Sequence, residues 1–160
     1  MENLKDTLMA AARDKGICAE GYSQMRLRDI GALIDYYIAN PDWCMERGFP
    51  DLATLKEDFA DCADKGVFVS RTFNGEVLNE RQAYIFHNCR GTIRTGLNVR
   101  SAIIPMLYFG NGCRMRIVGT GERSQMRHRP VVPLYLFGKN DVSARDNAYA
   151  MFTRTKHKLL

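Results

Sequence analysis

Three segments decide the expected fold: YIFHNCRGTIRTG at residues 84–96, LYFGNGCRMRIVGTG at 107–121 and LYLFGKNDVSARDN at 134–147. Each begins with aromatic and aliphatic residues, passes through a corner of glycine and asparagine, and continues as a short strand that contains arginine. Apolar and polar residues alternate along these strands, which is the periodicity of β structure. The three segments therefore indicate copies of one structural unit.

The spacing between the copies indicates how they are stacked. Their aligned phenylalanines are separated by 23 and 28 residues, and the corner asparagines follow at similar intervals. These residues are Phe86, Phe109 and Phe137, and Asn88, Asn111 and Asn140. A period in the twenties with short strands predicts coils of a parallel β-solenoid, and asparagine suits the corners because it tolerates left-handed backbone. A small antiparallel β-sandwich or roll is the alternative that the pattern leaves open.

The first third of the chain has a different periodicity. Apolar residues recur about every four positions in 2–16, 23–40 and 51–66, which predicts helices. Asparagine followed by Pro41 ends the second of these runs, and this proline is expected to open a short helix in PDWCMERG.

The period changes after Gly66, where β-branched and aromatic residues take over. The pair Asn74-Gly75 lies between two apolar segments and predicts a tight turn. We therefore expect an α+β protein. An N-terminal helical cap, residues 1–66, would be followed by a short parallel β-solenoid, residues 67–160, that shares one core with the cap.

Charge divides the chain in the same way. Residues 1–66 contain 8 Lys and Arg against 13 Asp and Glu, a net charge of −5, whereas residues 67–160 contain 15 against 5, a net charge of +10. The two values add to the net charge of +5 of the whole chain. This asymmetry predicts that the basic region has an anionic partner.

Composition excludes several classes of protein. With 46% hydrophobic and 26% charged residues, the chain has the composition of an ordinary globular protein. Its amino terminus lacks the apolar core of a signal peptide, and its longest apolar run, at 102–109, is shorter than the roughly 20 residues of a membrane span. We expect no membrane partner and a cytoplasmic location where the protein is made. Five widely spaced cysteines without a CxxC pair predict free thiols and no metal or other cofactor.

The corner GNGC at residues 110–113 raises the question of a phosphate-binding loop or a reactive thiol. It has no Lys or Ser/Thr at Walker spacing and leads into a strand, so we expect no nucleotide site. Cys113 and Cys89 follow matching corners, which predicts that they stack as small buried side chains. His87 close to Cys89 invites a nucleophile hypothesis, but no third partner is visible and a structural histidine is expected. We expect no catalytic residue and no enzyme.

Arginine is concentrated in the strands and loops of the basic region. On a strand, Arg114 and Arg116 point to one face while Met115 and Ile117 point to the other. That face is either a solvated outer surface or an electrostatic platform for nucleic acid or for the acidic third of a neighbouring subunit. The candidate interaction surface consists of Arg90, Arg94, Arg114, Arg116, Arg123, Arg127 and Arg129.

Four phrases of the chain carry a resemblance. They are GICAEGY at 16–22, LIDYYIANPDWCMERGFPDL at 33–52, DKGVFVSRTFNGEVLNERQAYIFHNCRGTI at 64–93 and RPVVPLYLFGKN at 129–140. Together they resemble short uncharacterised proteins carried by phages, prophages and other mobile elements of gut Bacteroidetes. The resemblance implies a mobile-element setting, in which small proteins serve as structural or adaptor parts, including parts of a virion. It implies no activity and assigns no functional residue.

These observations favour a non-catalytic structural or interaction protein. Its acidic helical and basic β regions would meet between subunits, which predicts a homo-oligomer or a complex with another protein. The alternative is a nucleic-acid-binding accessory protein that uses the arginine-rich β face. The first function predicts an assembly that loosens with salt, and the second predicts that nucleic acid co-purifies.

Overall fold

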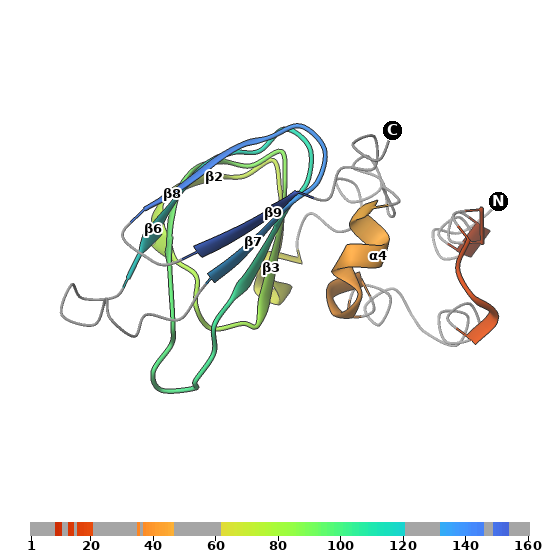
Figure 1. Cartoon of the computed structure of the whole chain (residues 1–160), viewed down its shortest axis with the longest axis horizontal. Coiled ribbons are helices and arrows are strands. Elements are labelled where there is room, and N and C mark those ends of the chain that lie inside the picture. The colour runs from red at the N-terminus through yellow and green to blue at the C-terminus, as the bar shows by residue number, and fades with distance from the viewer. Residues whose placement is uncertain are drawn as a thin grey trace. The chain divides into compact units, whose positions relative to one another are not determined.

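A computed structural model of the protein describes residues 9–10, 13–14, 16–20, 35, 37–46, 62–120, 132–145 and 149–153, with the backbone alone at 43, 62 and 149–153. The chain divides into two compact units, Met1–Phe59 and Ala60–Leu160 (Figure 1). The first unit contains described helix, and the second contains all of the described strands. Among the described residues the molecule is mostly β with few helices, which agrees with an α+β protein.

The first unit contains the helix α4, Pro41–Glu46. Proline suits its first position because that residue needs no hydrogen-bond donor there. The preceding turn is closed by the Asn40 N–H, which donates to the Tyr37 carbonyl at 3.3 Å, and the Cys44 N–H donates to the Asn40 carbonyl at 3.2 Å. The expected short helix is confirmed. The longer helices expected in 2–16 and 23–40 lie mostly outside the described residues, as does most of the one expected in 51–66.

The second unit opens with the 3-10 helix η1, Cys62–Lys65, which ends at Gly66 with a φ of +86°. The strands that follow form two sheets. The first sheet has the order β1-β3-β5-β7-β9 and the second sheet has the order β2-β4-β6-β8. Their bounds are β1 Val67–Val69, β2 Thr72–Val77, β3 Ala83–His87, β4 Arg90–Thr95, β5 Met106–Phe109, β6 Arg114–Gly119, β7 Val132–Leu136, β8 Asp141–Arg145 and β9 Tyr149–Thr153.

Every pair of neighbouring strands in these sheets is parallel, and each strand pairs with the next but one along the chain. The chain therefore alternates between the two sheets, as Figure 1 shows. Corners of two to four residues carry it from the first sheet to the second, as between Phe109 and Arg114. An antiparallel sandwich or roll is excluded for the described strands because all of the strand pairs among them are parallel.

The core lies between the two sheets and is organised by the parallel register. Phe68, Phe86 and Phe109 occupy matching positions on β1, β3 and β5. Their rings stack with centroids 5.4 and 5.0 Å apart, close to the strand spacing of about 4.8 Å. The next position in this register is Leu136. The alignment of Phe137 with the other phenylalanines is therefore wrong by one residue, and Phe137 begins the following corner, where its N–H donates to the Phe109 carbonyl.

Two of the three corner asparagines stack as expected. The Asn88 N–H donates to the Asn111 carbonyl at 3.0 Å, and Asn88 has a φ of +54°, the left-handed backbone that asparagine tolerates. Asn140 lies elsewhere, because the pairing of Arg114 with Asp141 places Asn140 beside Cys113. Its expected alignment is therefore wrong.

The expected turn at Asn74-Gly75 is also wrong. Both residues lie inside β2, where the pairing with β4 shifts between Asn74 and Glu76. Gly75 takes a φ of +89° within this β-bulge, and the Asn74 N–H donates to the Glu76 Oε1 at 2.8 Å. A bulge of this kind suits an outer strand because it hinders pairing with a foreign strand.

Candidate interaction surface

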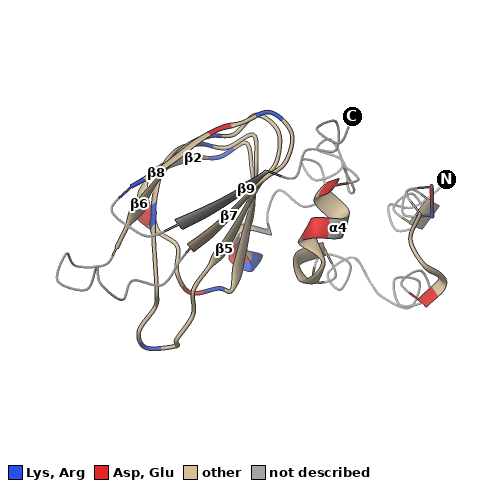
Figure 2. Ribbon diagram, in the orientation of Figure 1, with Lys and Arg blue, Asp and Glu red and all other residues tan. Residues whose placement is uncertain are grey.

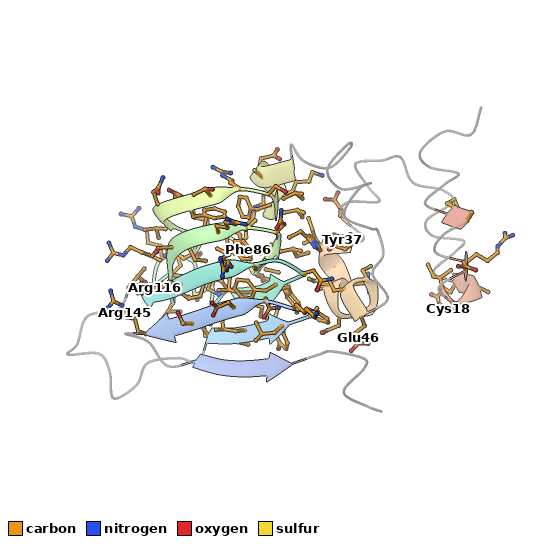
Figure 3. All side chains as sticks on the ribbon, turned by 90° about the horizontal axis from the view of Figure 1, so that it is seen from above. Cys18, Tyr37, Glu46, Phe86, Arg116 and Arg145 are labelled. Carbon is orange, nitrogen blue, oxygen red and sulfur yellow. The ribbon has the colours of Figure 1, made fainter. Side chains whose placement is uncertain are left out.

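The exposed face of the second sheet carries the arginines that the sequence singled out. Along β6, Arg114 and Arg116 are exposed while Met115 and Ile117 are buried in the core, so the expected alternation is confirmed. Arg90 and Arg94 are the exposed positions of β4. Figure 3 shows Arg116 extending outward from its strand, whereas Phe86 lies between the two sheets. The sequence pattern was sufficient here because alternate residues of a strand point to opposite faces.

One arginine on the exposed face of the second sheet was not among the residues that the sequence predicted. Arg145 is exposed at the end of β8 and projects from the second sheet near Arg116 in Figure 3. Its strand alternates exposed and half-buried positions, so the alternation in DVSAR was the signal that could have identified it. We define the arginine face as Arg90, Arg94, Arg114, Arg116 and Arg145.

Three further arginines that the sequence assigned to the surface, Arg123, Arg127 and Arg129, lie outside the described residues. The connection that contains them leaves β6 at Gly119 and enters β7 at Val132. Their membership of the surface stays a prediction.

Four guanidinium groups of the arginine face are available to a partner. Within the described part of the chain, Arg90, Arg94, Arg114 and Arg116 form no ion pair or hydrogen bond through their side chains. The exposed positions of the second sheet also carry two carboxylates, Glu76 and Asp141. Five arginines against two carboxylates give this face a positive field, and Figure 2 shows blue segments along the layer of β6 and β8.

The side chains of Cys89 and Cys113 are buried in the core, as the sequence predicted. Both side chains are fully buried, and the pairing of Arg90 with Arg114 places the two cysteines side by side. The Cys113 thiol donates to the Phe86 carbonyl at 3.4 Å, and the Cys89 thiol donates to the Phe68 carbonyl at 3.5 Å. Burial raises the pKa of Cys89, and it raises the pKa of Cys113 to about 12. A nucleophilic cysteine needs a thiolate at neutral pH, and the burial of both thiols disfavours that form.

His87 and Cys89 lie on either side of a turn, and the Cys89 thiol donates to the His87 carbonyl at 3.4 Å. His87 ends β3, and the left-handed backbone of Asn88 turns the chain before Cys89 enters the core. Burial lowers the pKa of His87 to about 4, which keeps the imidazole neutral at physiological pH. The ring occupies the space beside Gly110, where a Cβ atom would lie 2.5 Å from Nδ1. The expected interpretation as a structural histidine agrees with this environment.

The connection between β4 and β5, residues 96–105, is a second feature that the sequence did not single out. It contains Leu97, Val99 and Ile104, three of the four exposed large hydrophobic residues in the described part of the chain, and Val99 is 78% exposed. The Asn98 Oδ1 accepts from the Arg100 N–H at 3.1 Å. A backbone bridge between residues 98 and 103 closes the loop, so the apolar side chains are presented by an ordered segment.

Neither a metal site nor a membrane-spanning helix is found among the described residues. No group of three or more His, Cys, Asp or Glu side chains among them is placed to hold a metal ion. No helix in the same part of the chain has both the length and the apolar composition needed to cross a membrane.

Comparison with known proteins adds no relative. No protein-family model matches the chain, no curated protein matches it, and no solved structure matches it. The resemblance to mobile-element proteins therefore stays an expectation. Function has to be argued from the arginine face and from the fold that presents it.

Proposed function

We propose that this protein is a non-catalytic interaction protein that binds an acidic protein partner through its arginine face. The observation that carries the proposal is the set of exposed guanidinium groups of Arg90, Arg94, Arg114 and Arg116, which have no side-chain partner among the described residues. Arginine forms bidentate hydrogen bonds with carboxylates. Several arginines on one face give affinity and orientation that a single exposed pair does not.

The fold is suited to this role because it is a rigid support. We propose that the two sheets are the two faces of a short parallel β-solenoid and that residues 1–66 form its helical cap. The alternation of the chain between two parallel sheets supports the solenoid, and the difference in periodicity between the two parts of the sequence supports the cap. In a solenoid each strand is held by its neighbours, so the arginines keep fixed spacings.

The first partner to consider is a second copy of the chain. Residues 1–66 carry a net charge of −5 and residues 67–160 a net charge of +10, so the acidic part of one subunit complements the basic part of another. The protein would then be a homo-oligomer. In the mobile-element setting that the resemblance implies, such an assembly is a structural or adaptor part, made in the cytoplasm and carried in the virion where the element is a phage.

The mass of the purified protein tests this proposal. Light scattering after size exclusion is expected to show an oligomer at low salt and smaller species at high salt, because salt screens exposed charges. The variant Arg114→Glu/Arg116→Glu is expected to be a monomer at low salt.

A matched control separates the face from net charge. Arg100→Glu/Lys139→Glu makes the same change in net charge at two exposed residues outside the arginine face and is expected to assemble like the parent protein. A parent protein that has the mass of one chain, 18.2 kDa, at both salt concentrations would exclude self-assembly.

The second candidate function is a nucleic-acid-binding accessory protein. The pairing of β4, β6 and β8 places Arg116 between the hydroxyl side chains of Thr92 and Ser143, and all three are residue types that contact phosphate groups. This function predicts absorbance near 260 nm in the purified protein and an affinity that falls steeply with salt.

A further inference from the structure

The outward-facing side chains of the second sheet form three rows that cross the strands. Neighbours in a row are about 4.8 Å apart, and neighbouring rows are about 6.6 Å apart along a strand. The rows are Thr72, Arg90, Arg114 and Asp141; Asn74, Thr92, Arg116 and Ser143; and Val77, Arg94, Val118 and Arg145. The arginines therefore have a defined geometry that their sequence positions alone do not reveal.

Three arginines and a threonine meet at adjacent positions of the first two rows. Arg90 is paired with Arg114, and Arg116 follows Arg114 by two residues on the same face. Thr92, which is half-buried, occupies the fourth position. We call these four residues the arginine block.

The arginine block carries an electrostatic cost. Like charges directly opposite on neighbouring strands destabilise a sheet, and Arg90 and Arg114 are such a pair. No carboxylate in the described part of the chain forms an ion pair with either guanidinium group. An oxyanion between the two arginines would remove the repulsion and accept hydrogen bonds from both.

Asp141 limits the arginine block on one side. It is paired with Arg114, so Arg114 lies between another arginine and a carboxylate in its row. An anion that extends along the row towards β8 would meet the negative charge of Asp141. The favoured direction is therefore along the strands, from Arg114 to Arg116.

We infer that the arginine block binds two carboxylates of an extended acidic polypeptide segment and that Asp141 weakens this binding and limits its position. The inference rests on the proposed function, because it names the part of the arginine face that contacts the partner. Alternate residues of an extended chain are about 6.6 Å apart, which is the spacing from Arg114 to Arg116. The three rows contain no aromatic residue on which bases could stack, so they suit a polypeptide better than single-stranded nucleic acid.

Binding of fluorescently labelled poly-L-glutamate to the full-length protein at low salt tests the inference. Arg114→Gln is expected to weaken binding about tenfold, because it removes a charged bidentate donor. Asp141→Asn is expected to strengthen binding about threefold, because it removes a neighbouring negative charge. Arg100→Gln, outside the arginine face, is expected to change the affinity less than about twofold.

The stronger binding of poly-L-glutamate expected for Asp141→Asn is the decisive result, because a misfolded variant would not be expected to bind more tightly. Unchanged or weaker binding by Asp141→Asn would overturn the role of Asp141, and no binding by the parent protein would overturn the arginine block as a carboxylate site. Tighter binding of an oligothymidylate of equal charge would assign the face to nucleic acid instead. A monomer in light scattering would overturn only the self-assembly part of the proposed function. Self-assembly and carboxylate binding by the arginine block can therefore fail separately.

Discussion

The two sheets of the second unit share one core but differ in their outer faces. In the first sheet, consecutive residues such as Tyr84, Ile85 and Phe86 are all buried, so neither face of the strand is exposed. In the second sheet, β6 alternates strictly between exposed Arg114 and Arg116 and buried Met115 and Ile117 over its first four residues. Strands β3 and β5 of the first sheet are therefore stabilised by burial on both faces, whereas the second sheet is buried on one face and charged on the other.

This difference teaches how parallel strands are recognised in a sequence. Parallel strands that are buried on both faces have nearly continuous apolar runs, as in the stretches AYIFH and MLYF. Strands with one exposed face alternate, as in RMRIVG. Substitutions should therefore have large effects on stability in the first sheet and small ones at exposed positions of the second.

The largest effect is expected for the aromatic stack of the first sheet. Phe109 is fully buried, and its ring centroid lies 5.0 Å from that of Phe86. Phe109→Ala should lower the free energy of unfolding by about 3–5 kcal/mol, because it removes buried surface and leaves a cavity. Denaturation with urea measures this value. Phe109→Leu is the control and should cost no more than about 1.5 kcal/mol.

A smaller loss of stability is expected when a glycine of the second sheet is replaced. Gly91 has a φ of +104°, and a Cβ atom at this position would collide with the Phe73 carbonyl oxygen. Gly91→Ala should cost about 3 kcal/mol, because a backbone atom must move. Gly75 has a φ of +89° but open space around it, so Gly75→Ala should cost only about 1 kcal/mol. Equal melting temperatures for the two variants would contradict this explanation.

The first sheet should also make stability depend on pH through His87. Burial lowers the folded-state pKa to about 4 from the ordinary value of 6.5, so the unfolded chain binds the proton first as the pH falls. This contribution to stability is complete above about pH 6.5 and is lost between there and pH 4. The free energy of unfolding should fall by about 2 kcal/mol between pH 7.5 and pH 5. His87→Gln should flatten this dependence, and an unchanged slope in that variant would exclude His87 as its cause.

The smallest effect on stability is expected at the arginine face. Arg116→Gln should change the free energy of unfolding by less than about 0.5 kcal/mol, because the side chain is exposed and makes no contact that folding requires. The same variant should weaken binding of poly-L-glutamate. A large loss of stability would mean that Arg116 has a structural role and would contradict the proposed division between the two sheets.

Much of the candidate surface could be predicted from the sequence. The alternation after each corner identified the exposed positions of β4 and β6, because a strand allows its side chains only two directions. The same pattern in β8 could have identified Arg145. Burial of Cys89 and Cys113 was also predictable, because both follow similar corners. The arrangement of the arginines in rows could not be predicted from the sequence, because it depends on how neighbouring strands are paired.

The wrong alignments have one cause, which is that matching positions of the repeats do not carry the same residue types. The corners after β5 and β7 are equally long, so an alignment that matches phenylalanine with phenylalanine and asparagine with asparagine departs from the structural register. Leu136 rather than Phe137 continues the phenylalanine stack, and Asn140 lies beside Cys113 rather than beside Asn111. Asn74-Gly75 likewise has the local signature of a turn. It forms a bulge because β2 continues to pair with β4 on both sides of it.

The sequence by itself determined the change from helical to strand periodicity, the places of three corners and the inward or outward direction of most strand residues. These are local properties, which follow from backbone geometry within a few residues. The tertiary structure decided between the parallel solenoid arrangement and the antiparallel alternative, and it alone decided which residues stack across the strands and that Arg90, Arg114 and Arg116 form one block beside Asp141. Register decides these features because it depends on packing between strand residues 17 to 27 positions apart in the chain, and no local pattern records that packing.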